Sequence, residues 1–469
     1  MLTKFELNRP KITQLGIIAM LLFVCTAFVY LNPSRSLTTL LIGLVPAAVA
    51  LWFGLTYPQL GTVAIIVATL AVPFEIGTGT ESSINAGMLL LIAQLGLWVF
   101  HALFVDHAFK LMNERVVWAA LALIGAAIFG FLAGQVQWFS ISGAGIAPQI
   151  GGLLMFVLSA AALIMVGHQL SARHLQWMVM LFLILGAVFM LARIVPSVGR
   201  VVLPRFPSGA TGSMFWVWLG GLSFAQALFN HRLSIMARLL CGLLVGMMLY
   251  VALLTEARSW SSGWLPLVAT LGSILLFYIA RLRPRLLLLL LPLMLAGFIM
   301  VVANAVQTVD SVTNFSDESY SLLTRLDAYE IVLELAHRSP LFGLGPANYY
   351  WYTPLIPIRG WYVQFNSHSQ IIDLVAQVGY IGLAVYVWVL LEVGLLAWRL
   401  LPRVRAGFPT AYLLATLGGV VGTVIASALG DWVIPFVYNI GLTGFRASIL
   451  AWLFMGGVLV FVREEVVSG

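Results

Sequence analysis

The chain is built from a long series of apolar segments, each close to the roughly 20 residues that a helix needs to cross a bilayer. Hydrophobic residues make up 61% of it and charged residues 9%, whereas a soluble domain carries roughly 25% charged residues. Water cannot solvate so apolar a surface. Because an isolated span satisfies its backbone in lipid only as a helix, the sequence predicts an all-α, polytopic membrane helix bundle.

Counting apolar windows predicts about fourteen transmembrane helices, with a range of about 12 to 14. The first follows a basic N-terminus but lacks a small-x-small cleavage site, so we expect it to remain as an uncleaved helix. The predicted spans are 12–31, 37–57, 60–74, 84–104, 116–134, 150–170, 175–195, 213–229, 234–254, 262–281, 285–306, 370–398, 409–428 and 446–462.

The distribution of basic residues predicts the orientation of these helices. Connections on the side of the basic N-terminus carry most of the Lys and Arg, which the positive-inside rule assigns to the cytoplasm, with both termini there. The opposite, extracytoplasmic face receives Glu75 and Glu81, the uncharged loop 135–149 and the long segment 307–369. The predicted cytoplasmic residues include Lys110, Arg115, Arg173, Arg232, Arg238, Arg281, Arg283, Arg285, Arg399, Arg403, Arg405 and Arg463.

The long loop 307–369 divides the chain into three predicted parts: N-terminal helices 1–210, a catalytic core 211–400 that includes the loop, and C-terminal helices 401–469. A loop of this length is uncommon unless it carries function. Part of it has helical period, with Arg325, Glu330, Glu334 and Arg338 on the polar side, which predicts an amphipathic helix. Glu334 and Arg338 are spaced to pair. The predicted apolar stripe is Leu322, Leu326, Tyr329, Leu333 and Ala336.

Basic residues predicted on the extracytoplasmic face are all arginines, while the chain's three lysines, Lys4, Lys11 and Lys110, are predicted inside. A guanidinium is a planar fork suited to phosphate or carboxylate, so this set indicates an anionic ligand. The alternative is pairing with acids of the same face, such as Asp310, Asp327 and Glu330. The set is Arg35, Arg193, Arg200, Arg205, Arg258, Arg325, Arg338, Arg359 and Arg446.

Two of these arginines are the better candidates. Arg258 lies in Thr255-Glu-Ala-Arg-Ser-Trp-Ser-Ser-Gly263, just before a helix whose free backbone N–H groups favour an anion, although a lone arginine at a helix end can also reach lipid headgroups. Arg325 has no acid one turn earlier and is therefore freer to contact a ligand. Arg200 and Arg205, on the predicted outer loop from Pro196 to Pro207, are weaker candidates for the same anion.

His368 is the candidate acid-base residue. It precedes the long span 370–398, with Asn366 and Ser367 as plausible helix caps. A neutral imidazole can take a proton from a sugar hydroxyl near neutral pH, although a structural histidine is the alternative. Asp373, an ionisable residue within an apolar segment, is a second candidate. No zinc-ligand spacing, nucleotide-binding glycine motif or serine nucleophile motif is present, and Gly343-Leu-Gly-Pro346 is predicted to be a turn.

Taken in order, these motifs resemble the O-antigen ligase and polymerase superfamily of bacterial surface-polysaccharide enzymes. The resemblance covers roughly residues 215 to 400 and depends on the motifs as an ordered set. A frequent family pattern has Asn directly after the histidine, where this chain has Ser369. This chain therefore lacks any function that depends on that amide, whereas the role of the histidine is unaffected. The motifs are Arg258-Ser-Trp, Arg325 before an amphipathic helix, Ser339-Pro-Leu-Phe-Gly-Leu-Gly-Pro346, Asn366-Ser-His368-Ser, and Leu374 with Gly379 and Gly382.

The resemblance implies a metal-independent, inverting glycosyltransferase with no cofactor, located in the bacterial cytoplasmic membrane with an extracytoplasmic active site. Its donor would be an undecaprenyl-diphosphate-linked saccharide and its acceptor a lipid-linked or lipid A core saccharide, with membrane lipids and no nucleic acid as partners. Arg258 and Arg325 would bind the diphosphate, and His368 would orient or deprotonate the acceptor. Four aromatic residues of the loop, Trp351, Tyr352, Trp361 and Tyr362, would stack on sugar rings, although interfacial aromatic belts explain them equally well.

Within the family, a polymerase of O-antigen, capsule or exopolysaccharide repeat units is slightly favoured, because nothing in the sequence identifies a lipopolysaccharide acceptor. A ligase acting on lipid A core or on protein is the alternative. A secondary transporter or flippase of an anionic solute is the alternative from another class. It predicts repeated halves and ionisable residues near the bilayer midplane, and we find no convincing internal repeat.

Overall fold

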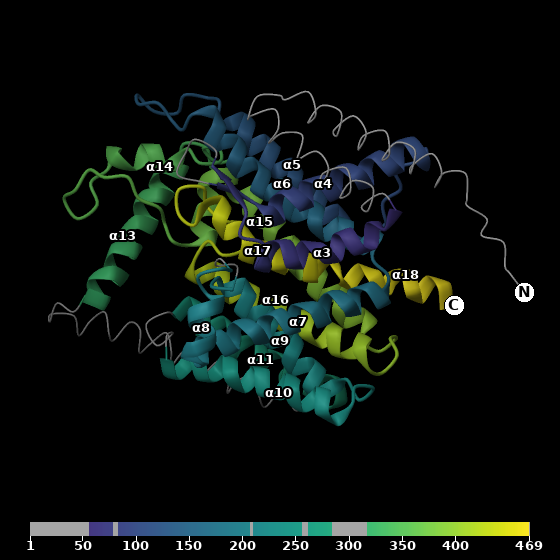
Figure 1. The fold of residues 1–469 in the computed structure, drawn as a ribbon. Helices are drawn as coiled ribbons and strands as arrows, with labels where there is room; N and C mark the ends of the chain where they lie inside the picture. The colour runs from purple at the N-terminus through teal and green to yellow at the C-terminus, as the bar shows by residue number, and fades with distance from the viewer. Residues whose placement is uncertain (1–55, 78–82, 207–209, 256–260, 284–316, 469) are drawn as a thin grey trace, which may run out of the picture.

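A computed structural model describes residues 56–77, 83–206, 210–255, 261–283 and 317–468. This part of the chain is a bundle of apolar helices, with α13 and α14 at one end and the C-terminus at the other (Figure 1). The helices are α3 Pro58–Ala71, α4 Ala86–Phe100, α5 Arg115–Ala133, α6 Ile146–Gln169, α7 Ala172–Ile194, α8 Pro196–Val202, α9 Ser213–Phe229, α10 Ile235–Tyr250, α11 Ser261–Leu282, α13 Asp317–Ala336, α14 Tyr349–Tyr352, α15 Gln370–Leu400, α16 Phe408–Leu429, α17 Gly441–Gly456 and α18 Val458–Ser468.

The predicted membrane spans agree with these helices. Within the described ranges, nine helices are long and apolar enough to cross a membrane, and α3 and α9 are shorter apolar helices. Three of the nine extend beyond one α-helix. α4 and α10 continue into the π-helical turns His101–Val105 and Val251–Thr255, and the span Gly441–Arg463 joins α17 to the first part of α18. The chain is therefore a polytopic helical membrane protein. The predicted spans 12–31 and 285–306, and nearly all of 37–57, lie outside the described residues.

Two helices form the centre of the bundle. α9 packs against α10, α11, α16 and α17, and the large side chains of Trp216 and Trp218 on it are fully buried. α17 is buried over most of its length and contributes the fully buried Trp452. A helix that is apolar on all sides belongs in the interior of a bundle, so these two set the core around which the other helices pack.

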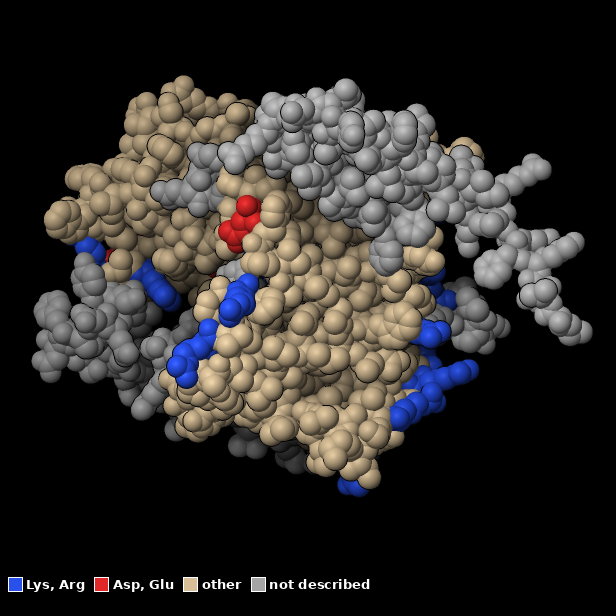
Figure 2. All heavy atoms as spheres, viewed as in Figure 1, with Lys and Arg blue, Asp and Glu red and all other residues tan. Residues whose placement is uncertain are grey.

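Charged side chains keep to the ends of the bundle on the face that Figure 2 shows. Lys and Arg gather toward both ends, and the described surface between them is almost free of charge. A wide uncharged belt is what lipid contact requires, because an unpaired charge in hydrocarbon is costly.

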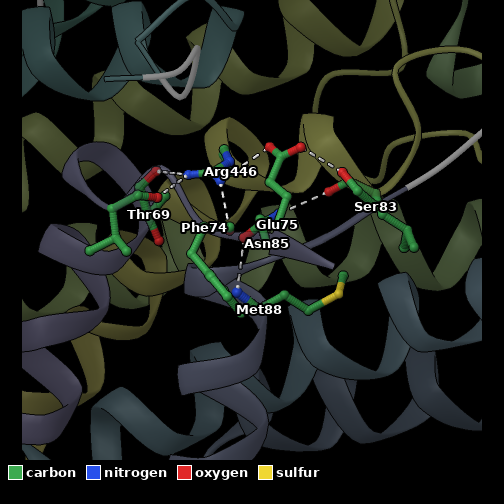
Figure 3. Close-up of polar contacts among 9 residues, drawn as sticks. Thr69, Phe74, Glu75, Ser83, Asn85, Met88 and Arg446 are labelled. Atoms are coloured by element: carbon green, nitrogen blue, oxygen red, sulfur yellow. Dashed lines mark hydrogen bonds and ion pairs between the residues drawn. The ribbon is translucent and has the colours of Figure 1, made fainter. Parts of the chain in front are cut away.

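The arginine set was predicted to bind an anionic ligand, but one of its members, Arg446, is buried and serves the fold instead. It is 1% exposed, and its guanidinium donates to the backbone carbonyls of Thr69, Val72 and Phe74 and to Glu75 Oε1 at 3.1–3.2 Å (Figure 3). These carbonyls lie at and beyond the C-terminal end of α3, where the helix leaves them without partners. Arg446 therefore fastens α17 to the end of α3.

The segment held by Arg446 is a two-stranded hairpin that the all-helical prediction did not include. β1 Glu75–Gly77 pairs antiparallel with β2 Ser83–Asn85, with Glu75 opposite Asn85. Ser83 Oγ donates to the Glu75 carboxylate at 2.7 Å, and the Asn85 side chain donates to Leu442 O at 3.0 Å (Figure 3). Both strands are thus tied to α17, directly or through Arg446.

Candidate functional site

The frame of the site is a break in α15. At Gly379 the backbone adopts φ 71° and ψ −176°, so the helix stops and restarts. Residues 340–345 fill the break and pair the backbone groups that it frees, which membrane-embedded backbone requires. Four backbone hydrogen bonds do this: Leu344 N to Ala376 O at 2.8 Å, Gly345 N to Gln377 O at 3.1 Å, Tyr380 N to Pro340 O at 2.8 Å and Ile381 N to Leu341 O at 3.3 Å.

Glycine is required where these two segments touch. A Cβ at Gly379 would lie 2.2 Å from Leu341 O, and one at Gly343, where φ is +72°, would lie 2.5 Å from the Gln377 carbonyl carbon. The predicted turn at Gly343-Leu-Gly-Pro346 is present. It leads to Asn348, which is fully buried and bonds to the backbone of Ala144, Gly134 and Leu344 at 2.8–3.0 Å. The glycine motif and the helix break therefore form one rigid unit.

His368 is presented on a tight turn just before α15. Its φ is +52°, a left-handed conformation that is uncommon outside glycine. Asn366 Oδ1 accepts from His368 N at 3.2 Å, and Ser367 Oγ donates to Asp373 Oδ1 at 2.7 Å. The hydroxyl of Tyr349 donates to the same Asp373 oxygen. The buried Asp373 thus braces the turn that exposes His368.

The predicted caps of this helix are wrong in detail. The helix begins at Gln370 with Ser369 as its N-cap, and neither Asn366 nor Ser367 occupies that position. Their side chains stabilise the turn instead, because Ser367 Oγ both accepts from Ser369 N and donates to Asp373. Residues that sequence places at a helix start can equally hold the loop in front of it.

Arg325 is close enough to His368 for its charge to act on the imidazole. The partial burial of the His368 ring and then the positive charge of Arg325 lower the pKa of this histidine from its ordinary value. The imidazole is therefore neutral at physiological pH. Among the described residues no carboxylate pairs with Arg325, so its charge is available to an anion.

The predicted amphipathic helix is present as α13, but its buried face differs from the predicted stripe. Leu326 is 47% exposed, and the buried residues lie about one position away. Tyr329, one turn from Arg325, faces the site instead, where its hydroxyl interacts with the Ser369 side chain. The predicted Glu334–Arg338 pair is absent, since Arg338 lies 5.9 Å over the Phe139 ring. The buried face is Ala328, Ile331, Val332, Leu335 and Ala336.

The connection between α16 and α17, residues 430–440, completes the site and was missed by the sequence analysis. Asn439 Nδ2 lies 3.4 Å from His368 Nδ1 and donates to Asp431 Oδ1 at 2.5 Å. Asp431 Oδ2 accepts from Phe436 N at 2.8 Å. Burial raises the pKa of Asp431 to about 6, against the effect of these two hydrogen bonds. An acid directly after an apolar span was the available signal, because such residues are rarely without a role.

The same connection is fixed to the start of α15. Gln370 Oε1 accepts from the backbone N–H groups of Val433 and Ile434 at 3.3 and 2.7 Å. Phe436 stacks on Tyr349, with ring centroids 4.7 Å apart, and Tyr438 stacks on Tyr350 at 4.5 Å. The buried Asp431 and Asp373 are near enough to repel each other. Elements more than sixty residues apart in sequence thus form one polar cluster around His368.

The remaining predicted site residues do not join this cluster. Arg200 and Arg205 are exposed on and just after α8, where Arg205 bonds its own helical turn through Val201 O at 2.7 Å. Trp361 and Tyr362 are 69% and 67% exposed at the tip of the loop before His368. Arg258 lies outside the described residues.

Other arginines of the predicted extracytoplasmic set have structural partners. Arg359 pairs with Asp327 at 2.6 Å, which is the alternative of acid pairing that the sequence left open. Arg193 donates to Ala210 O at 3.3 Å and lies over the Trp216 ring. In the described part of the chain, no group of three or more His, Cys, Asp or Glu side chains is arranged to hold a metal ion. Of the described set, Arg325 is the member whose charge acts on His368.

The arrangement can bind an anion at Arg325 and handle a proton at the adjacent neutral imidazole of His368. A comparison with curated proteins found no match. A family model described as "O-Antigen ligase" matches residues 243–387. The matched segment contains Arg258, Arg325, His368 and the break in α15, and ends before Asp431. Residues 243–387 of this polytopic membrane protein are thus similar to the O-antigen ligase family.

Proposed function

We propose that this protein is an inverting glycosyltransferase that moves a saccharide from an undecaprenyl-diphosphate carrier to a hydroxyl of an acceptor glycan. The observation that carries the proposal is that Arg325, which has no carboxylate partner among the described residues, acts electrostatically on the neutral His368. One group suits a diphosphate and the other suits a sugar hydroxyl. The two residues can therefore contact the donor and the acceptor of a glycosyl transfer.

His368 is the residue assigned to the acceptor. Its lowered pKa keeps the imidazole neutral, which is the form that can accept a proton from the attacking hydroxyl. Attack from the face opposite the diphosphate inverts the anomeric carbon. The bond from the acceptor oxygen to this carbon forms as the bond to the diphosphate oxygen breaks.

Arg325 and Arg258 are assigned to the leaving diphosphate. Negative charge develops on the bridging oxygen as it leaves, and fixed guanidinium groups stabilise that charge without a metal ion. Arg200 and Arg205 are exposed and would meet the diphosphate only at the edge of the site. Their contribution is therefore expected to be smaller.

The donor also needs an apolar surface for its polyprenyl chain. A groove of about 400 Å³ between α7 and α10 is lined almost entirely by apolar side chains, among them Leu183, Ala187, Leu240 and Leu244. α10 continues through Val251–Thr255 toward the segment that carries Arg258. We assign the groove to part of the polyprenyl chain, and the exposed Trp361 and Tyr362 to sugar rings of the acceptor.

The orientation follows from the charge distribution. Arg115, Arg399 and Arg463 lie at helix ends remote from the start of α15, where His368 is located. With these arginines in the cytoplasm, His368 lies on the extracytoplasmic face of the bacterial inner membrane, with both termini inside. This is the face on which lipid-linked saccharides are joined to acceptors in the proposed reaction.

A polymerase of repeat units for O-antigen, capsule or exopolysaccharide is slightly favoured over a ligase, because the chain has no feature specific to a lipid A core or protein acceptor. A transporter would use the broken helix α15 to bind an ion at freed backbone groups. Here residues 340–345 occupy those groups with four hydrogen bonds. The break is thus structural, which counts against the transporter.

The test is complementation of a deletion strain with wild type, Arg325→Ala, His368→Ala or Arg258→Ala at matched membrane levels, with glycan measured by gel ladder. Each variant should lower product by on the order of 10²- to 10³-fold and accumulate the lipid-linked saccharide. Arg338→Ala is the control, because Arg338 lies two residues after the end of the same helix and over the Phe139 ring. Unchanged product in all three variants would overturn the assignment and favour the transporter. The gel also separates the two enzyme types: loss of long glycan chains indicates a polymerase, whereas loss of their attachment to the acceptor at unchanged length indicates a ligase.

A further inference from the structure

The side chains behind His368 form a chain of contacts that ends at a buried acid. His368 Nδ1 faces Asn439 Nδ2 at 3.4 Å, and the same amide nitrogen donates to Asp431 Oδ1 at 2.5 Å. Asp431 is 2% exposed and its other oxygen is occupied by Phe436 N. Neither Asp431 nor Asn439 lies within the matched segment 243–387.

The charge of Asp431 decides how the Asn439 amide is turned. An ionised carboxylate only accepts hydrogen bonds, so it requires the amide nitrogen of Asn439 on its side. That nitrogen then offers its second N–H to His368 Nδ1. A neutral imidazole with Nδ1 accepting must carry its proton on Nε2, the nitrogen directed away from Asn439.

A proton on Asp431 reverses this arrangement. The carboxylic acid becomes a donor, which the amide oxygen of Asn439 accepts once the amide has turned over. The same oxygen can then accept from His368 Nδ1–H. Nε2 is left with a free lone pair, which is the form that takes a proton from an acceptor hydroxyl.

We infer that Asp431, acting through the amide of Asn439, determines which ring nitrogen of His368 carries the proton. Both are positioning residues, since neither touches the reacting atoms in the proposed reaction. The inference relies on the proposed function only in taking His368 as the residue that handles the acceptor proton. The raised pKa of Asp431, about 6, places its change of charge in the physiological range.

The charged and titratable groups around this chain of contacts come from several elements. Arg325 of α13 acts on His368. Asp373 of α15 and Tyr349 of α14 both interact with the charge of Asp431. Each stays in place in the variants below, so their influence is common to all samples.

The experiment measures the reactivity of the His368 ring with diethyl pyrocarbonate, which acylates an unprotonated ring nitrogen through its lone pair. Full-length protein in detergent is modified for a series of times, and the acylated peptide is measured by mass spectrometry. His337, exposed at the end of α13, is the internal reference. The variants are Asp431→Asn, whose amide mimics the protonated acid, and Asn439→Ala, which removes the link.

At pH 7.5 the wild-type His368 should react several-fold more slowly than in either variant, relative to His337. Its rate should rise as the pH falls from 8 to 6, the reverse of an ordinary histidine, and Asp431→Asn should lose this rise. Equal His368 rates in wild type and both variants, or an ordinary pH profile in wild type, would overturn the inference. Thermal midpoints no lower than that of wild type exclude misfolding of the two variants as the cause.

This readout needs no glycan substrate, so it separates the two proposals. If the reactivity pattern is found and His368→Ala still makes product, the proposed function fails and the control of the imidazole stands. If His368→Ala is inactive and the reactivity pattern is absent, the proposed function stands without the role of Asp431.

Discussion

Arg446 and Arg325 were predicted to lie on the same face and to serve the same kind of ligand, and the molecule uses them in opposite ways. Arg446 is buried and its guanidinium is shared among three carbonyl oxygens and the Glu75 carboxylate. Arg325 is only partly buried, and its described surroundings include a neutral histidine and no acid partner. The first arginine stabilises the fold and the second is left available.

The partners of an arginine, and not the residue type, therefore decide its role in a membrane protein. Burying a charge is costly unless hydrogen bonds and an opposite charge compensate it. Where compensation is complete, no capacity remains for a ligand. Where it is incomplete at an accessible position, an anionic ligand can supply it.

The largest expected difference between the two arginines is in the free energy of unfolding of their methionine variants. Arg446→Met should lower the free energy of unfolding by about 3–5 kcal/mol, because it leaves a carboxylate and buried carbonyls without a partner. Arg325→Met, the matched variant, should stay within about 0.5 kcal/mol of wild type, since it breaks no described ion pair. Thermal midpoints of both proteins in detergent test this. A thermal midpoint for Arg446→Met equal to that of wild type would mean that Arg446 does not stabilise the fold.

The next effect concerns the frame that holds the open site rigid. Gly379→Ala should destabilise by about 2–3 kcal/mol, because alanine is strained at positive φ and its Cβ would meet the Leu341 carbonyl oxygen. Gly394→Ala, in the regular part of the same helix, is the control. Its Cβ would have its nearest neighbour at 4.0 Å, so the thermal midpoint should not fall. A loss of similar size in both variants would mean that the break at Gly379 has no special role.

Much of the fold was predictable because hydropathy alone identifies helices that must lie in lipid. The motif residues His368 and Arg325 could also be found, since polar groups in a long loop between spans are conspicuous. The partners of these residues could not. Arg446 meets carbonyls more than 370 residues earlier in the chain, and His368 meets Asn439 after two intervening helices. Such contacts depend on tertiary packing, which a pattern of apolar residues does not encode.

The smallest expected effect on stability is at the buried acid Asp431. Its charge destabilises the fold, whereas the charge of Arg446 stabilises it. Burial raises the pKa of Asp431 to about 6, above the roughly 3.9 of an exposed aspartate. Between these values the folded protein binds a proton that the unfolded chain does not. The fold therefore gains stability as the pH falls through 6 and loses it as the pH rises. At pH 7.5 the ionised carboxylate therefore costs the fold stability that the protonated acid does not.

Asp431→Asn should remove this cost, because asparagine keeps two hydrogen-bonding atoms at the same place and carries no charge. Its thermal midpoint should exceed that of wild type at pH 7.5 and approach it at pH 4.5, where the wild-type acid is protonated. Glu334→Gln, at an exposed position on α13, is the control and should follow wild type at both pH values. A destabilised Asp431→Asn at pH 7.5 would mean that the negative charge is itself compensated, as it is for the Arg446 cluster. The contrast between a fully compensated charge and an incompletely compensated one would then hold for Arg446 and Arg325, and not for Asp431.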